Sequence, residues 1–200
     1  MELKDRIIQN ASALFSRNGI KSVAMSDIAS KLGISKRTLY EVFHDKDELL
    51  EKCIDFHMSN ADREIEAIAN NSENVIDALM LIYFKHLHTA QEVNPSVLHD
   101  LKKYYAHIYK KIECRQKIGY YAFIPLVQKG IEQGLIRKDT NFEVLLWLVR
   151  AQFKALLEDE YIPTDKYSTK EFISAIILNF IRGISTSSGN ERIDKIVANI

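Results

Sequence analysis

Apolar residues recur every three or four positions along most of the chain, which is the spacing of a buried helical face. The first segment shows this pattern in a stripe of five residues: Leu3, Ile7, Ala11, Leu14 and Phe15. Gly19 follows at the place where a left-handed cap would end the helix. No segment shows the strict alternation expected of a strand. The pattern therefore predicts an all-α fold.

Later helix boundaries carry the same signals, and about nine helices are expected in all. Two short helices are predicted near residues 25–32 and 36–43, followed by longer ones over 46–69 and 73–92. A short sixth helix begins near Pro95, and a long seventh covers about 106–133. Because Pro125 lacks a backbone donor, we expect a kink in the seventh. The last two long helices, about 142–158 and 168–185, are apolar on more than one side.

Residues 25–44, which read MSDIASKLGISKRTLYEVFH, have the layout of a helix-turn-helix. Ala29 lets two helices cross closely, Gly33 can adopt positive φ in the turn, and Ser35 is placed to cap the second helix. The exposed residues of that helix would be Lys36, Arg37, Thr38, Tyr40 and Glu41. Such side chains suit guanine edges and phosphates, although the same spacing also fits a helical hairpin with a solvated basic face.

The residues around this motif extend the pattern over the first 50 positions. They are Ile28-Ala29, Gly33-Ile34-Ser35, Thr38-Leu39-Tyr40, Phe43, Lys46 and Glu48-Leu49-Leu50. This arrangement resembles the TetR/AcrR family of transcriptional regulators, and the later text EDEYIPTDKYSTKEFISAIILNFIRGIS is similar to the end of family members. The resemblance implies a three-helix DNA-binding domain in residues 1–48 and a helical ligand-sensing and dimerisation domain in residues 49–200.

The resemblance also implies roles for individual residues. Lys36 and Arg37 would face the bases, whereas Thr38, Tyr40 and Lys46 would hold phosphates. The full set of expected DNA-binding residues is Ser26, Ser35, Lys36, Arg37, Thr38, Tyr40, His44 and Lys46. The chain departs from the family at Ala24 and Met25, where Ser or Thr usually caps the first helix of the motif, so that cap is absent.

The second domain is expected to bind a small-molecule effector, whose identity the sequence does not reveal, and no cofactor. Candidate pocket residues are Phe56, His57, Tyr83, Tyr105, Tyr109, Tyr121 and Trp147, each of which is also compatible with ordinary core packing. The resemblance implies a homodimer through the last two long helices. A two-fold dimer places recognition helices about 34–36 Å apart, so the expected partner is double-stranded operator DNA with a near-palindromic sequence. We expect a repressor that the effector releases from this operator.

Composition limits the other classes of protein. The 200 residues are 46% hydrophobic and 27% charged with a net charge of zero, which argues against a chain that coats nucleic acid without selectivity. Residues 1–50 hold eight basic and seven acidic residues, so DNA binding must depend on how these charges are arranged. No apolar stretch approaches the roughly 18 residues that span a bilayer, and charge follows Met1, so we expect a cytoplasmic protein without a membrane partner.

Two other classes of protein fit parts of this sequence. An enzyme could use Cys53 with His57 four residues on, or His86 with His88, but neither pair has the further partners that zinc needs, and we expect no metal and no catalytic residues. Cys53 and Cys114 lack metal-type spacing, which favours reduced thiols. The second rival is an architectural DNA-binding protein without a ligand. Near-zero charge and a large second domain disfavour it.

Overall fold

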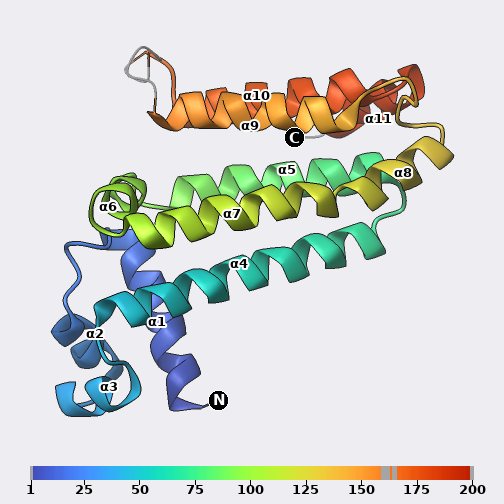
Figure 1. Cartoon of the computed structure of the whole chain (residues 1–200). Coiled ribbons are helices and arrows are strands. Elements are labelled where there is room, and N and C mark those ends of the chain that lie inside the picture. Colours follow the sequence, from blue (N-terminus) through green and yellow to red (C-terminus); the bar gives the residue numbers. More distant parts are fainter. Residues whose placement is uncertain (1, 159–162, 164–165, 199–200) are drawn as a thin grey trace. The chain divides into compact units, whose positions relative to one another are not determined.

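The computed structural model describes residues 2–158, 163 and 166–198, with backbone alone at residues 90–91, 116–122 and 157–158. Over this range the chain is all-helical, apart from one isolated antiparallel bridge between Ile136 and Ser185, which confirms the predicted fold class. The helices are α1 (Leu3–Asn18), α2 (Met25–Leu32), α3 (Lys36–Val42), α4 (Lys46–Asn71), α5 (Val75–Glu92), α6 (Ser96–Tyr104), α7 (Ala106–Ala122), α8 (Ile124–Glu132), α9 (Phe142–Glu158), α10 (Thr169–Ile184) and α11 (Ser187–Val197) (Figure 1).

Eleven helices are found in the described residues where about nine were expected, for two local reasons. The long segment over 106–133 is two helices that meet at Phe123, and Pro125 lies in the first turn of α8. Proline fits the start of a helix because its missing N–H would have no partner there, so the expected kink is a full break. The second difference is α11, for which Thr186 acts as cap by accepting a 3.2 Å bond from the Gly189 N–H.

The chain forms two compact units. The first comprises Met1–Glu64 and Glu92–Lys117, and the second comprises Ile65–Gln91 and Ile118–Ile200. In the first unit, α1, α2 and α3 pack on the start of α4 and on α6 and α7 through one apolar core, whose fully buried members include Ile7, Ile28, Leu39, Phe43, Leu49 and Ile108. The helices that the sequence assigns to DNA binding therefore share a core with α6 and the first half of α7.

Ion pairs strengthen the packing of α7 on α4 in the first unit. The Lys111 ammonium lies 2.8 Å from Glu51 and 3.0 Å from Asp55, and Arg115 lies 2.6 Å from Asp62. These pairs are partly solvated, so each is expected to contribute little alone. Their regular spacing along both helices nevertheless fixes the register between α4 and this part of α7.

The second unit is built around α5. Its buried face, which includes Ile76, Leu79, Met80 and Tyr83, packs in one core with residues of α8, α10 and α11. Arg192 of α11 ties the end of the chain to α5 through a 2.7 Å ion pair with Asp77. The helices α9 and α10 run side by side (Figure 1). None of the helices in the described residues is long and apolar enough to cross a membrane.

Candidate nucleic-acid interface

The turn between α2 and α3 has the geometry that the sequence predicted. Gly33 adopts φ 66° and ψ 31°, and the Ile34 N–H reaches back 3.0 Å to the Ala29 carbonyl. A Cβ on Gly33 would meet nothing within 4 Å, so the left-handed backbone alone makes glycine the favoured residue there. Ala29 is buried where α2 packs in the core. The turn therefore directs α3 outward while its Leu39 side is buried.

The first turn of α3 is stabilised by Ser35. Its hydroxyl accepts a 3.0 Å hydrogen bond from the Thr38 N–H and lies 2.9 Å from the Thr38 hydroxyl. This is the N-cap that the residue types predicted, and it satisfies one of the free N–H groups at the start of the helix. Ser35 and Thr38 thus have a structural role in shaping α3, beside any contact with a phosphate.

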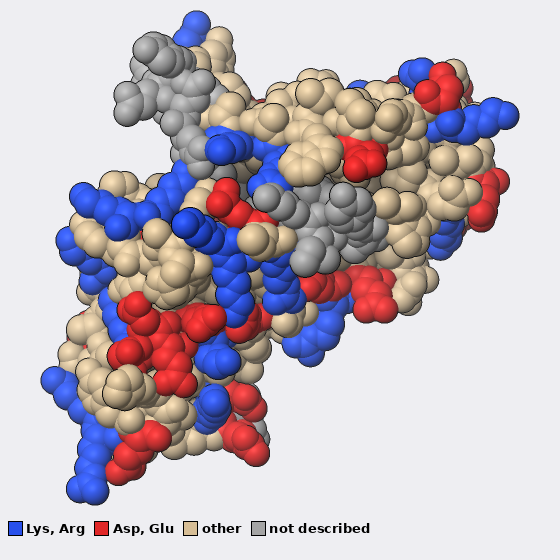
Figure 2. Space-filling model, viewed as in Figure 1, with Lys and Arg blue, Asp and Glu red and all other residues tan. Residues whose placement is uncertain are grey.

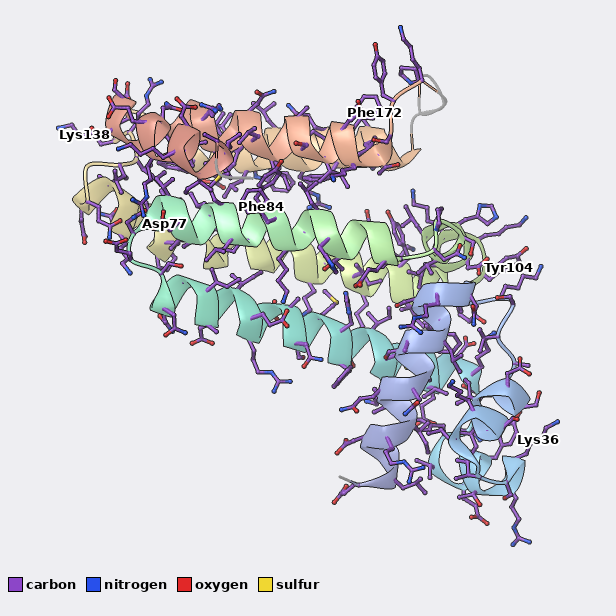
Figure 3. All side chains as sticks on the ribbon, turned by 180° about the vertical axis from the view of Figure 1, so that it is seen from behind. Lys36, Asp77, Phe84, Tyr104, Lys138 and Phe172 are labelled. Carbon is purple, nitrogen blue, oxygen red and sulfur yellow. The ribbon has the colours of Figure 1, made fainter. Side chains whose placement is uncertain are left out.

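The outer side of α3 carries Lys36, Arg37, Tyr40 and Glu41, all exposed. Figure 3 shows Lys36 projecting outward from the start of the helix. Arg37, whose side chain is 89% exposed, forms a 3.0 Å ion pair with Glu41 one turn later. Acidic and basic side chains lie beside each other at this end of the first unit (Figure 2), in keeping with its nearly balanced charge. The surface of α3 that could contact DNA bases is therefore a set of exposed hydrogen-bond donors on one short helix.

The start of α2 shows how the chain compensates for its missing cap. Ala24 has no hydroxyl, but the Asp27 carboxylate accepts a 2.8 Å hydrogen bond from the Ala24 N–H. An acidic group in the first turn also interacts favourably with the helix dipole. Ser26 lies partly exposed in this turn. The departure from the family pattern thus removes a hydroxyl while leaving the start of α2 anchored.

The start of α4 has a reciprocal cap followed by an inward-turned lysine. The His44 N–H donates to Glu48, and the Glu48 N–H donates to Asp45, each over 2.8 Å, while the His44 side chain is exposed. The Lys46 ammonium donates a 2.6 Å hydrogen bond to the Ile20 carbonyl. Burial lowers the pKa of Lys46, an effect that nearby carboxylates, Asp100 first among them, oppose. Lys46 differs in this way from the solvated lysine on α3.

An anchor that the sequence analysis missed joins α6 to the loop after α1. The Asp100 carboxylate is buried and accepts a 2.7 Å hydrogen bond from the Lys21 N–H. The Asn94 backbone and side chain donate to the carbonyls of Ser16 and Arg17 over 2.7 and 3.1 Å. These bonds satisfy carbonyls at the end of α1 that have no helical partner. No local pattern could have revealed them, because the partners lie some 80 residues apart in the chain.

The expected ligand-binding residues are distributed over both compact units. Phe56, His57, Tyr105 and Tyr109 belong to the first unit, where His57 is exposed and both tyrosines pack against the core. Tyr83 is buried in the second unit with its hydroxyl 2.6 Å from Ser174, and Trp147 is 51% exposed on α9. The side chain of Tyr121 lies outside the described residues.

Cys53, one of the groups considered for catalysis, lies in the core of the first unit. Cys53 is buried, and burial raises the pKa of its thiol to about 11, so the reactive thiolate is scarce at neutral pH. No set of three or more potential metal ligands comes together among the described side chains.

Comparison with known proteins agrees with this geometry. Residues 7–53 match the family described as bacterial regulatory proteins, tetR family. Over 183 residues the chain is 25% identical to the uncharacterized HTH-type transcriptional regulator YvaF of Bacillus subtilis, covering 90% of this chain and 94% of that protein. It is 32% identical over 90 residues to IcaR of Staphylococcus aureus, a negative transcriptional regulator of a biofilm operon, covering 45% of this chain and 48% of IcaR.

Solved structures of transcriptional regulators have a similar fold. A transcriptional regulator from Cytophaga hutchinsonii, 20% identical in sequence, superposes with a TM-score of 0.71 over 91% of this chain and 98% of that structure. The match thus extends from the helix-turn-helix through the helices of the second unit. The chain is therefore similar to TetR-type bacterial transcriptional regulators, by sequence in its helix-turn-helix and by fold over most of its length.

Proposed function

We propose that this protein represses transcription by binding a palindromic operator as a homodimer and leaves the operator when a small molecule binds. The observation that carries the proposal is the capped, outward-facing α3 with Lys36, Arg37 and Tyr40 exposed within a helix-turn-helix of the family. IcaR, which is similar to this chain over 90 residues, is a negative transcriptional regulator, which supports repression as the output. The protein acts in the cytoplasm, where its operator lies.

We assign base contacts to Lys36 and Arg37. The ion pair between Arg37 and Glu41 is fully solvated, so exchanging Glu41 for a guanine edge costs little. Phosphate contacts are assigned to Thr38 and Tyr40, and Ser26, Ser35 and His44 flank them at the helix ends. Lys46 uses one of its three donors on Ile20, which leaves two for a phosphate. Residues 1–48 thus supply the contacts with DNA, and residues 49–200 supply dimerisation and sensing.

The dimer is proposed to form through α9 and α10. Val144, Trp147 and Leu148 of α9 are each about half exposed and, by helical spacing, lie on one face. An apolar face of this kind on a regulator that acts as a dimer is best explained by a second copy of the chain that covers it.

Release of the operator follows from thermodynamic linkage between operator DNA and the effector. An effector that favours a subunit arrangement with the wrong spacing of recognition helices lowers operator affinity, and operator must lower effector affinity by the same factor, about 5- to 150-fold for typical couplings. A ligand-independent architectural protein would show no such reciprocity.

The test begins by selecting operators from a pool of random duplexes with the purified dimer, followed by binding measurements using fluorescence anisotropy. Arg37→Ala is expected to lower the affinity for the selected operator by about 10-fold or more, because one bidentate base contact is worth about 1–3 kcal/mol. The affinity for random duplex should stay unchanged. Lys52→Ala removes an exposed charge from α4 and serves as the matched control. A monomeric protein without preference for any duplex would rule the proposal out.

A further inference from the structure

Arg150 of α9 is unlike the other arginines of the second unit. Arg137, Arg182 and Arg192 each form an ion pair with a carboxylate, over 3.1, 2.7 and 2.7 Å. The Nη1 atom of Arg150 is buried and has no hydrogen-bond partner among the described residues. The contact that its guanidinium does make is with an aromatic ring, since its central carbon lies 5.3 Å from the centre of the Trp147 ring. A charged donor is thus buried without an anion.

The position of Arg150 on α9 places this charge beside apolar surface. Phe153, three residues further on, packs against the core of the second unit, whereas Trp147, three residues before, is half exposed. Arg150 is itself partly buried and lies between these two sides of the helix. A guanidinium stays charged in proteins and presents parallel donors that match a carboxylate or a phosphate. Burying such a donor unpaired is costly, and an anion would remove that cost.

We propose that Arg150 binds the anionic head group of the effector, a carboxylate or a phosphate attached to an apolar body. Trp147 stacks against the guanidinium and holds its plane, and the neighbouring apolar side chains accommodate the body of the ligand. The inference rests on the proposed function, because it names the chemistry of the effector. Anion binding by Arg150 does not require that the ligand release DNA. The inference about the effector and the proposed repressor function can therefore fail separately.

The experiment uses the full chain and its single tryptophan as reporter. Decanoate, decyl phosphate and decanol are titrated at constant ionic strength, below the concentrations at which they aggregate, with Trp147 fluorescence and calorimetry as readouts. We expect saturable binding of at least one of the two anions and about 10-fold or weaker binding of decanol. The better anion identifies the head group. Operator binding is measured in a separate assay, so loss of repression and loss of anion binding are distinguished.

Variants at Arg150 decide whether its charge is responsible. Arg150→Gln is expected to lower the affinity for the preferred anion by about 10-fold or more, and Arg150→Lys is expected to recover part of that affinity. Lys138→Gln removes an exposed charge from the same unit and is expected to bind like the wild type. Because the buried Nη1 atom of Arg150 has no hydrogen-bond partner among the described residues, the melting temperature of Arg150→Gln should change little.

Three results would overturn the inference. The first is equal affinity of the anion for the wild type and Arg150→Gln, and the second is absence of binding for both anions. The third is a shift of Arg150→Gln from dimer to monomer in sedimentation with anion affinity unchanged. That last result would assign the guanidinium to a carboxylate of the second subunit.

Discussion

The Lys46 ammonium donates a 2.6 Å hydrogen bond to the Ile20 carbonyl and thereby ties the first residue of α4 to the loop between α1 and α2. The same ammonium lies 5.7 Å from the centre of the Phe15 ring. One side chain thus connects three elements of the DNA-binding unit, and the position of α3 between α2 and α4 depends on these connections.

Replacing Lys46 by methionine tests both its structural and its DNA-binding roles. Lys46→Met keeps most of the apolar stem but leaves the Ile20 carbonyl without its donor, so the free energy of unfolding should fall by about 1 kcal/mol in urea titrations. Affinity should fall equally for operator and random duplex, and the salt slope of binding should decrease by about one. Lys52→Met, on the exposed side of α4, is the control. Unchanged stability would show that the Ile20 bond contributes nothing measurable.

Gly19 and Gly33 are expected to tolerate alanine differently. Both have positive φ, but Gly33 (φ 66°, ψ 31°) lies in the left-handed helical region, which costs a side-chain residue about 1–2 kcal/mol, whereas Gly19 (φ 85°, ψ 158°) lies in a region that essentially only glycine adopts. At Gly19 a Cβ would also collide with the Ser96 hydroxyl of α6, whereas at Gly33 it would meet open space. Gly19→Ala should therefore lower the melting temperature more than Gly33→Ala. The double variant Gly19→Ala/Ser96→Ala should regain part of the lost melting temperature while staying below Gly33→Ala, because the backbone strain at Gly19 remains. The absence of any rescue would contradict the contact.

The two cysteines should differ in reactivity. Cys114 is exposed and Cys53 is buried, so a thiol reagent at neutral pH should modify one cysteine rapidly and the second only after the protein unfolds. Cys114→Ser should abolish the rapid phase, and Cys53→Ala should leave it unchanged. Rapid modification of both thiols would show that the core around Cys53 opens readily.

The pKa of Cys53 also predicts a pH dependence of stability. The thiol titrates near 9.0 when unfolded and near 11 when folded, so the unfolded chain loses this proton first as the pH rises. The stability due to the neutral buried thiol is complete below pH 9.0 and declines between there and about 11, by about 2–3 kcal/mol at most. In urea titrations across this window, wild type should lose more stability than Cys53→Ala.

A charge on the apolar face of α9 should separate the subunits. Leu148 is 51% exposed, and an aspartate there would be buried unpaired if a second copy covers the face. Leu148→Asp should sediment as a folded monomer and bind operator about 10-fold or more weakly, because one short helix alone binds poorly. Val197→Asp, at an exposed position of α11, should remain dimeric. A dimeric Leu148→Asp would place the interface elsewhere.

Features determined by neighbours in sequence were predictable. The periodicity of Ile7, Ala11 and Phe15 predicted α1, and Gly33 and Ser35 predicted the turn and cap of α3, because these structures arise from contacts within a few residues. Two local features were not predicted: the division of the 106–133 segment, since Pro125 allows either a kink or a new start, and the last helix α11.

The sequence by itself thus determined most of the helices, the turn and cap of α3 and the similarity to TetR-type regulators. Tertiary structure alone decided that Lys46 turns toward Ile20, that the buried Asp100 accepts from the Lys21 N–H, and that the Nη1 atom of Arg150 is buried without a hydrogen-bond partner among the described residues. The physical reason is that an ion pair or hydrogen bond between residues 26 or 79 positions apart leaves no periodic pattern in the chain. Such partners become known only when the helices are packed and each buried donor and acceptor is accounted for.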